Sequence, residues 1–69
     1  MTKYELICYW SETDEVFLVE VPELPGCMAD GKTRDVAVKN AEEAIRLWLE
    51  TAREIGREIP KPRGRLAYA

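Results

Sequence analysis

The sequence predicts an α+β domain of order β-β-β-α-β, in which one long helix covers one face of an antiparallel sheet. Apolar side chains alternate with period two in residues 4–10 and 16–21, which is typical of strands. Residues 33–56 instead repeat at steps of three and four, which is typical of an amphipathic helix. The chain has 69 residues, enough for a single domain, and we expect that one domain spans residues 1–69.

The first two predicted strands form a hairpin. Residues 4–10 place Tyr4, Leu6 and Cys8 on one side and their neighbours on the other. The polar segment SETDE, residues 11–15, is a short turn-forming connection to the second strand at residues 16–21.

Proline and glycine residues indicate where the remaining short elements begin and end. Pro22 cannot donate to a sheet ladder, so it ends the second strand, and residues 22–26 form a rigid connection. We expect a short third strand at residues 27–29 and a turn at Asp30-Gly31. Residues 65–68 are a candidate fourth strand at an edge of the sheet.

The predicted helix has recognisable start and stop signals. Thr33 is suited to cap its first turn, and Gly56 is suited to the left-handed conformation that closes a helix. Its small residues predict close packing on the sheet, and we expect Trp48 to lie in the core. The apolar stripe consists of Ala37, Ala41, Ala44, Trp48, Ala52 and Ile55.

One helix covers only one side of a sheet, yet both sides of the predicted strands are apolar. An open apolar face of this kind indicates an interaction surface, and for so small a domain we expect self-association into at least a homodimer. Unpaired edge strands offer a second route to the same end. The alternative is that these side chains lie singly among charges and stay exposed to water. The predicted oligomer interface comprises Ile7, Tyr9, Val16 and Leu18.

Composition narrows the class of protein. The net charge of −3 and the absence of a basic patch before the last residues argue against direct nucleic-acid binding. No apolar run is long enough for a membrane span or a signal peptide, and two cysteines are too few for a disulfide scaffold. We therefore expect free thiols and a cytoplasmic protein.

Catalytic equipment is scarce. The chain has no histidine, which removes the commonest general base and metal ligand and every Ser-His or Cys-His pair. We expect no catalytic residues, no metal and no cofactor. The alternative from another class is a residual metal-dependent nuclease, whose oxygen ligands would converge on Mg²⁺. Its candidate carboxylates are Glu5, Glu20, Asp30 and Asp35.

Several segments together resemble the HicB-like antitoxin family. They are VPELPGC at 21–27, a Gly-x-Thr helix start at 31–33, NAEEAIRLWLE at 40–50 and IPKP at 59–62. The resemblance implies a partial ribonuclease-H-like fold without the nuclease carboxylates. It also implies binding and neutralisation of HicA, a small toxin that cleaves mRNA with a histidine. Longer members carry a DNA-binding domain, which we do not expect in this chain.

Acidic side chains near the sheet edges are candidates for contact with a basic toxin, because complementary charge steers association. The alternative is a stand-alone homo-oligomeric module that binds a different protein. The candidate partner-binding residues are Glu12, Asp14, Glu15, Glu23 and Asp30.

Overall fold

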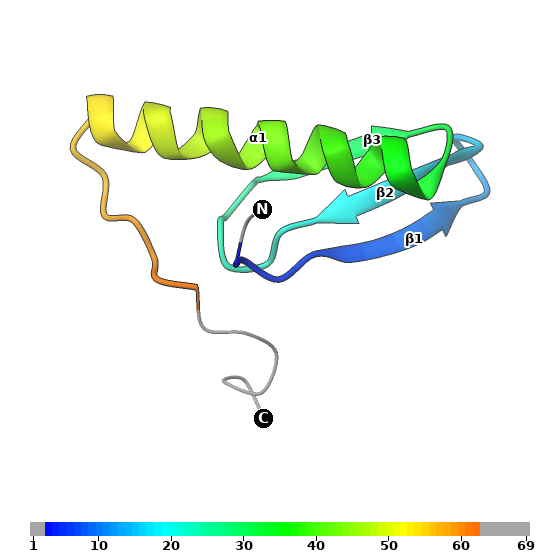
Figure 1. The fold of residues 1–69 in the computed structure, drawn as a ribbon, viewed down its shortest axis with the longest axis horizontal. Coiled ribbons are helices and arrows are strands. Elements are labelled where there is room, and N and C mark those ends of the chain that lie inside the picture. Colours follow the sequence, from blue (N-terminus) through cyan, green and yellow to red (C-terminus); the bar gives the residue numbers. More distant parts are fainter. Residues whose placement is uncertain (1–2, 63–69) are drawn as a thin grey trace.

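The structure is a computed structural model that describes residues 3–62 (Figure 1). Its elements are β1 (Ile7–Ser11), β2 (Val16–Glu20), β3 (Met28–Gly31) and α1 (Arg34–Glu54). Three antiparallel strands followed by one long helix confirm the predicted α+β class. The expected fourth strand, residues 65–68, lies outside the described residues.

The sheet has the order β1-β2-β3, and both pairs of neighbours are antiparallel. Tyr9 lies opposite Leu18, and Leu18 lies opposite Asp30 on its other side. The first strand begins at Ile7, later than predicted, and it continues to Ser11, which pairs with Val16. The alternation of side chains is as the sequence predicts.

The expected turn at Asp30-Gly31 is wrong, because β3 continues through both residues. Gly31 pairs with Phe17, and a Cβ added at Gly31 would lie 2.5 Å from the backbone nitrogen of Ala37. The glycine is therefore needed for close approach of the helix, since any side chain here would collide with the first turns of α1. The Asn40 amide nitrogen also donates to the carbonyl oxygen of Asp30 at 2.7 Å.

Both ends of α1 are capped as the sequence predicts. Thr33 Oγ1 accepts a hydrogen bond from the backbone N–H of Val36 at 3.2 Å. At the other end Gly56 has a φ of 72°, and the Arg57 N–H donates to the carbonyl oxygen of Ala52 at 2.7 Å. The Gly56 N–H also donates to the Arg53 carbonyl oxygen at 3.3 Å. These two hydrogen bonds and the positive φ form a Schellman motif, which fixes the direction in which the chain leaves the helix.

The core has two parts because the helix is longer than the strands. At 21 residues α1 spans roughly 32 Å, whereas a five-residue strand spans roughly 17 Å. The first half of α1 packs over the strands, through Val19, Ala37 and Ala41. The second half extends beyond the sheet, as Figure 1 shows, and packs on the segment between β2 and β3. That second cluster consists of Val21, Leu24, Cys27 and Ile45.

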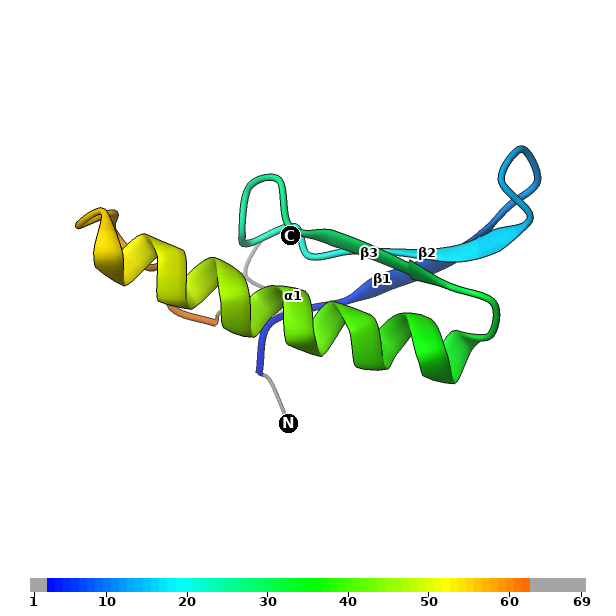
Figure 2. The same cartoon turned by 90° about the horizontal axis from the view of Figure 1, so that it is seen from above.

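The helix packs mainly on β3 and β2 and hardly on β1, and in Figure 1 β1 is the strand farthest from α1. Figure 2 shows the sheet nearly edge-on, with α1 on one side of it. Cys8 and Trp10 therefore remain exposed, although they point to the helix side of the sheet. Trp10 packs edge-on against Phe17, with ring centroids 5.1 Å apart. The Arg34 guanidinium lies over the Phe17 ring, 5.1 Å from its centroid.

Candidate partner-binding surfaces

The face of the sheet opposite α1 is apolar and accessible, as the sequence predicts. Ile7 is 46% exposed and Met28 is 53% exposed, whereas Val16 and Leu18 are half-buried. Register defines the members of this open face, because residues directly opposite each other share a side of the sheet. The open face consists of Ile7, Tyr9, Ser11, Val16, Leu18, Glu20, Met28 and Asp30.

The charged side chains of the open face are both carboxylates. Glu20 lies in the central strand and Asp30 in β3. Tyr9 Oη donates to Glu20 Oε2 at 2.6 Å, which holds one carboxylate beside an aromatic ring. This hydrogen bond raises the pKa of Tyr9, since loss of the phenolic proton would place a phenolate against a carboxylate. The open face therefore combines apolar area with negative charge.

The hairpin tip, residues 12–15, extends the same charge beyond the end of the sheet. Glu12, Asp14 and Glu15 are all exposed there. The backbone N–H of Asp14 donates to Ser11 Oγ at 3.3 Å, and the N–H of Glu15 donates to the Ser11 carbonyl oxygen at 2.8 Å. These bonds fix the turn, so the three carboxylates project from a defined loop.

Glu23 does not belong with these exposed carboxylates. Only 6% of it is accessible, and its Oε1 accepts the backbone N–H of Glu5 at 3.1 Å. Burial and then the Glu23 carboxylate raise the pKa of the neighbouring Tyr4. We expected Glu23 at a partner-binding surface, but the structure buries it. Its hydrogen bond instead connects the segment before β1 to the loop after β2. Sequence reasoning missed this because a carboxylate between two prolines looks like a solvated loop residue.

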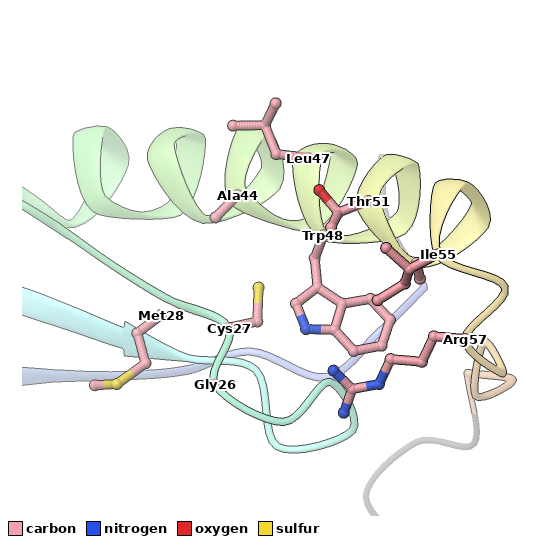
Figure 3. Close-up of a pocket in the computed structure, with 10 residues that line it drawn as sticks. Gly26, Cys27, Met28, Ala44, Leu47, Trp48, Thr51, Ile55 and Arg57 are labelled. Atoms are coloured by element: carbon pink, nitrogen blue, oxygen red, sulfur yellow. The ribbon is translucent and has the colours of Figure 1, made fainter.

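A second uncovered surface lies where the helix overhangs the sheet, and we call it the Trp48 groove (Figure 3). Its volume is about 380 Å³, within the ~300–1,000 Å³ of typical ligand clefts. The side chains are mostly apolar and come from α1 and the residues just after it, from the start of β3 and from the segment before β3. The lining residues are Gly26, Cys27, Met28, Ala44, Leu47, Trp48, Thr51, Ala52, Ile55 and Arg57.

Trp48 forms one wall of this groove. It packs against the second core cluster, as expected, but it is only half-buried, so it lies at the edge of the core and not inside it. Its indole N–H donates to the carbonyl oxygen of Pro25 at 3.0 Å, and the Arg57 guanidinium lies 4.9 Å from the ring centroid. The ring therefore lies between the loop and the residue that follows the helix cap, as Figure 3 shows. The excess length of the helix over the strands is the signal in the sequence that could have indicated an overhang.

The two cysteines occupy different environments and are both free. Cys27 is buried at the inner wall of the groove, and burial raises the pKa of its thiol. A thiol held protonated is a poor nucleophile, so Cys27 acts as a small apolar residue.

The carboxylates of the alternative hypothesis, a metal-dependent nuclease, do not gather into a metal site in the structure. Within residues 3–62, no three Asp, Glu, Cys or His side chains gather closely enough to hold a metal ion. Nor does the described part of the chain contain a helix long and apolar enough to cross a membrane.

Comparison with known proteins gives a match over residues 4–67 to the family described as HicB-like antitoxin of bacterial toxin-antitoxin system. The chain belongs to the HicB-like antitoxin family. A UPF0150 protein of Thermoplasma acidophilum is 41% identical to this HicB-like chain over 59 residues, which cover 86% of the chain and 84% of the relative. A UPF0150 protein of Archaeoglobus fulgidus is 36% identical over 44 residues, 64% of each chain.

A third relative is much longer than this HicB-like chain. It is an uncharacterised 14.9 kDa protein from the rep-hol intergenic region of Haemophilus phage HP1, 38% identical over 50 residues. The match covers 72% of the chain but only 38% of the phage protein. Family membership indicates a regulatory role in a toxin-antitoxin system rather than an enzymatic one.

Proposed function

We propose that this chain binds and neutralises a small HicA-type toxin that cleaves mRNA. The observation that carries the proposal is the open face, which combines apolar area with two charged residues, both of them carboxylates. A basic ribonuclease surface is complementary to it, because the apolar residues supply contact area and the carboxylates supply steering. The toxin is cytoplasmic in this proposal, since its substrate is mRNA, and so is this chain.

The exposed carboxylates form the partner-binding set of the proposal. Asp30 lies on the open face itself, and Glu20 now joins it. The hairpin tip contributes the other three carboxylates, on the loop that joins β1 and β2. Glu23 is left out because it is buried. The proposed set is Glu12, Asp14, Glu15, Glu20 and Asp30.

Co-expression tests this function directly. If the adjacent gene encodes a small protein, that protein is expressed alone and together with this chain, while growth and mRNA integrity are followed. We expect arrest and mRNA cleavage with the neighbour alone, and rescue of both on co-expression. A neighbour that remains toxic in the presence of this chain would refute the antitoxin role.

Matched charge reversals then test the surface. Glu20→Lys lies on the open face, whereas Glu43→Lys lies on the exposed side of α1, where Glu43 pairs only with Arg46 at 2.6 Å. We expect the first variant to weaken toxin binding by about tenfold and the second to change it less than twofold, as measured by calorimetry. Tenfold corresponds to about 1.4 kcal/mol.

Self-association is a second function favoured by the same surface. The predicted interface, comprising Ile7, Tyr9, Val16 and Leu18, lies on one face and includes two strongly exposed side chains. Stacking two open faces also brings Glu20 and Asp30 of both copies together, and like charges in a closing interface oppose association. The homodimer is therefore weaker than the toxin complex and is displaced by the toxin. Sedimentation with and without toxin measures that exchange, and a homodimer that persists inside the toxin complex would contradict it.

A further inference from the structure

The Trp48 groove adjoins the open face at Met28 but differs from it in charge. Among residues 3–62, the groove is lined by apolar side chains apart from Thr51 and Arg57, and Arg57 is charged. Met28 is the residue that both surfaces share. Leu47 is 49% exposed and Ile55 is 68% exposed along its rim. Large apolar side chains clustered around a concave surface indicate a docking site rather than scattered surface residues.

The walls of the groove are held rigidly before any partner arrives. The loop between β2 and β3 is closed by three backbone bonds among Val21, Leu24 and Cys27, of 3.0 to 3.1 Å. On the opposite wall the indole of Trp48 is anchored on the Pro25 carbonyl oxygen. A preformed cleft binds without the entropic cost of ordering its own side chains.

Arg57 supplies the polar recognition. The Schellman bond of its backbone N–H to Ala52 fixes its position after the helix, and its guanidinium lies over the Trp48 ring. Among residues 3–62, no carboxylate lies within ion-pair distance of Arg57. A guanidinium stacked on an aromatic face still directs its N–H groups sideways, in the fork that matches a carboxylate.

We propose that the Trp48 groove binds a segment of a partner polypeptide that presents an apolar side chain close to an Asp or Glu side chain. The apolar side chain enters the cleft beside Trp48 and contacts Leu47 and Ile55 at the rim. The carboxylate pairs with Arg57 at the end of the cleft. Charge complementarity separates this partner from the basic toxin, which the carboxylates of the open face attract. The chain thus has two docking surfaces of opposite charge preference.

The test uses short capped peptides in which leucine is followed by glutamate, glutamine or lysine, titrated into the full ¹⁵N-labelled chain. The indole N–H resonance of Trp48 reports on the groove, and the backbone amides of Leu18 and Asp30 report on the open face. We expect the glutamate peptide to shift the Trp48 resonance and leave the open-face amides unchanged. Its affinity should exceed that of the glutamine peptide by about two- to fivefold, as for a partly exposed ion pair. The lysine peptide should bind least.

Two exposed arginines give a matched pair of variants. Arg57→Gln should abolish the preference for glutamate over glutamine, whereas Arg46→Gln, on the outer side of α1 between Glu43 and Glu50, should preserve it. Leu47 is exposed, so Leu47→Lys should leave the fold intact, and it should weaken the binding of all three peptides. Equal binding of the glutamate and lysine peptides, or shifts confined to the open face, would overturn the proposal. So would a wild-type homodimer that Leu47→Lys converts to monomer, because the groove would then be the interface between copies.

Discussion

The open face and the Trp48 groove are both apolar surfaces that the fold leaves uncovered, but they arise from different causes. The open face exists because one helix covers only one side of a sheet, so alternate residues of each strand remain accessible. The groove exists because α1 is longer than the strands and must rest its second half on a loop. The first cause is visible in the period of the sequence, whereas the second depends on how two elements of unequal length are stacked.

The two surfaces also differ in charge. The open face carries Glu20 and Asp30, whereas Arg57 is the charged residue among the described residues that line the groove. Surfaces of opposite charge on one small domain do not compete for the same partner. Experiments that remove one surface and keep the other therefore test this comparison.

The largest effect is expected from Trp48→Ala, which removes a wall of the groove and leaves the open face intact. We expect a loss of about 2–3 kcal/mol in the free energy of unfolding, below the ~3–5 kcal/mol typical of a fully buried Trp, because this ring is half-buried. Trp48→Phe should lose only about 0.5–1.5 kcal/mol, for the missing bond to Pro25. Urea denaturation measures both. A Trp48→Phe variant as stable as the wild type would show that the bond to Pro25 does not contribute to stability.

Gly31→Ala should separate the helix from β3, the strand that contributes Met28 to both surfaces. The added Cβ meets backbone atoms of α1, which cannot swing aside as a side chain can. We expect a loss of about 1–3 kcal/mol, the range for overpacking a tight contact. Lys32→Ala, at the exposed neighbouring position, should change stability by less than about 0.5 kcal/mol. Equal stability of the two variants would mean that α1 does not approach β3 so closely.

Salt should change the affinities of the two complexes proposed for the open face, the toxin complex and the homodimer, in opposite directions. Raising the ionic strength from about 0.1 M to 1 M shortens the screening length from about 10 Å to 3 Å. We expect the toxin complex to weaken, because attraction is screened, and the homodimer to strengthen, because repulsion between carboxylates is screened. Sedimentation and calorimetry at both salt concentrations measure this. A homodimer that dissociates in high salt would place self-association elsewhere on the molecule.

The smallest effect concerns the titration of Tyr9 on the open face. Its folded pKa is raised by the bond to Glu20, so this bond contributes to stability at pH values below the ordinary tyrosine pKa. The contribution is lost as the pH rises through the raised folded value. Glu20→Gln should return the Tyr9 pKa towards its ordinary value, as followed by the ring resonances in NMR. An unchanged Tyr9 titration would show that the bond does not persist in solution.

Much of this arrangement could be predicted from the sequence, because it follows from local chemistry. The hairpin, the Thr33 and Gly56 caps and the open face all rest on periodicity or on one residue's backbone preference. Asp30-Gly31 was misread because this dipeptide commonly marks a turn, whereas here the glycine is needed for contact with a helix distant in space. Glu23 was misplaced, and Trp48 was placed too deep in the core, for a related reason. Their burial depends on the loop on which the helix comes to rest, and the sequence gives no period for a loop.

The hydrogen bond from Asn40 to the carbonyl oxygen of Asp30 has a consequence for growth by strand addition. It occupies a backbone acceptor of β3 with a side chain of the same molecule, and the strand is short and carries a charge, all of which blunt an edge. Among the strands of residues 3–62, β1 forms the other edge, so extension of the sheet would take place there. Because a two-fold axis would use that edge in both copies at once, strand addition between copies would end at a pair and would not propagate into a fibre.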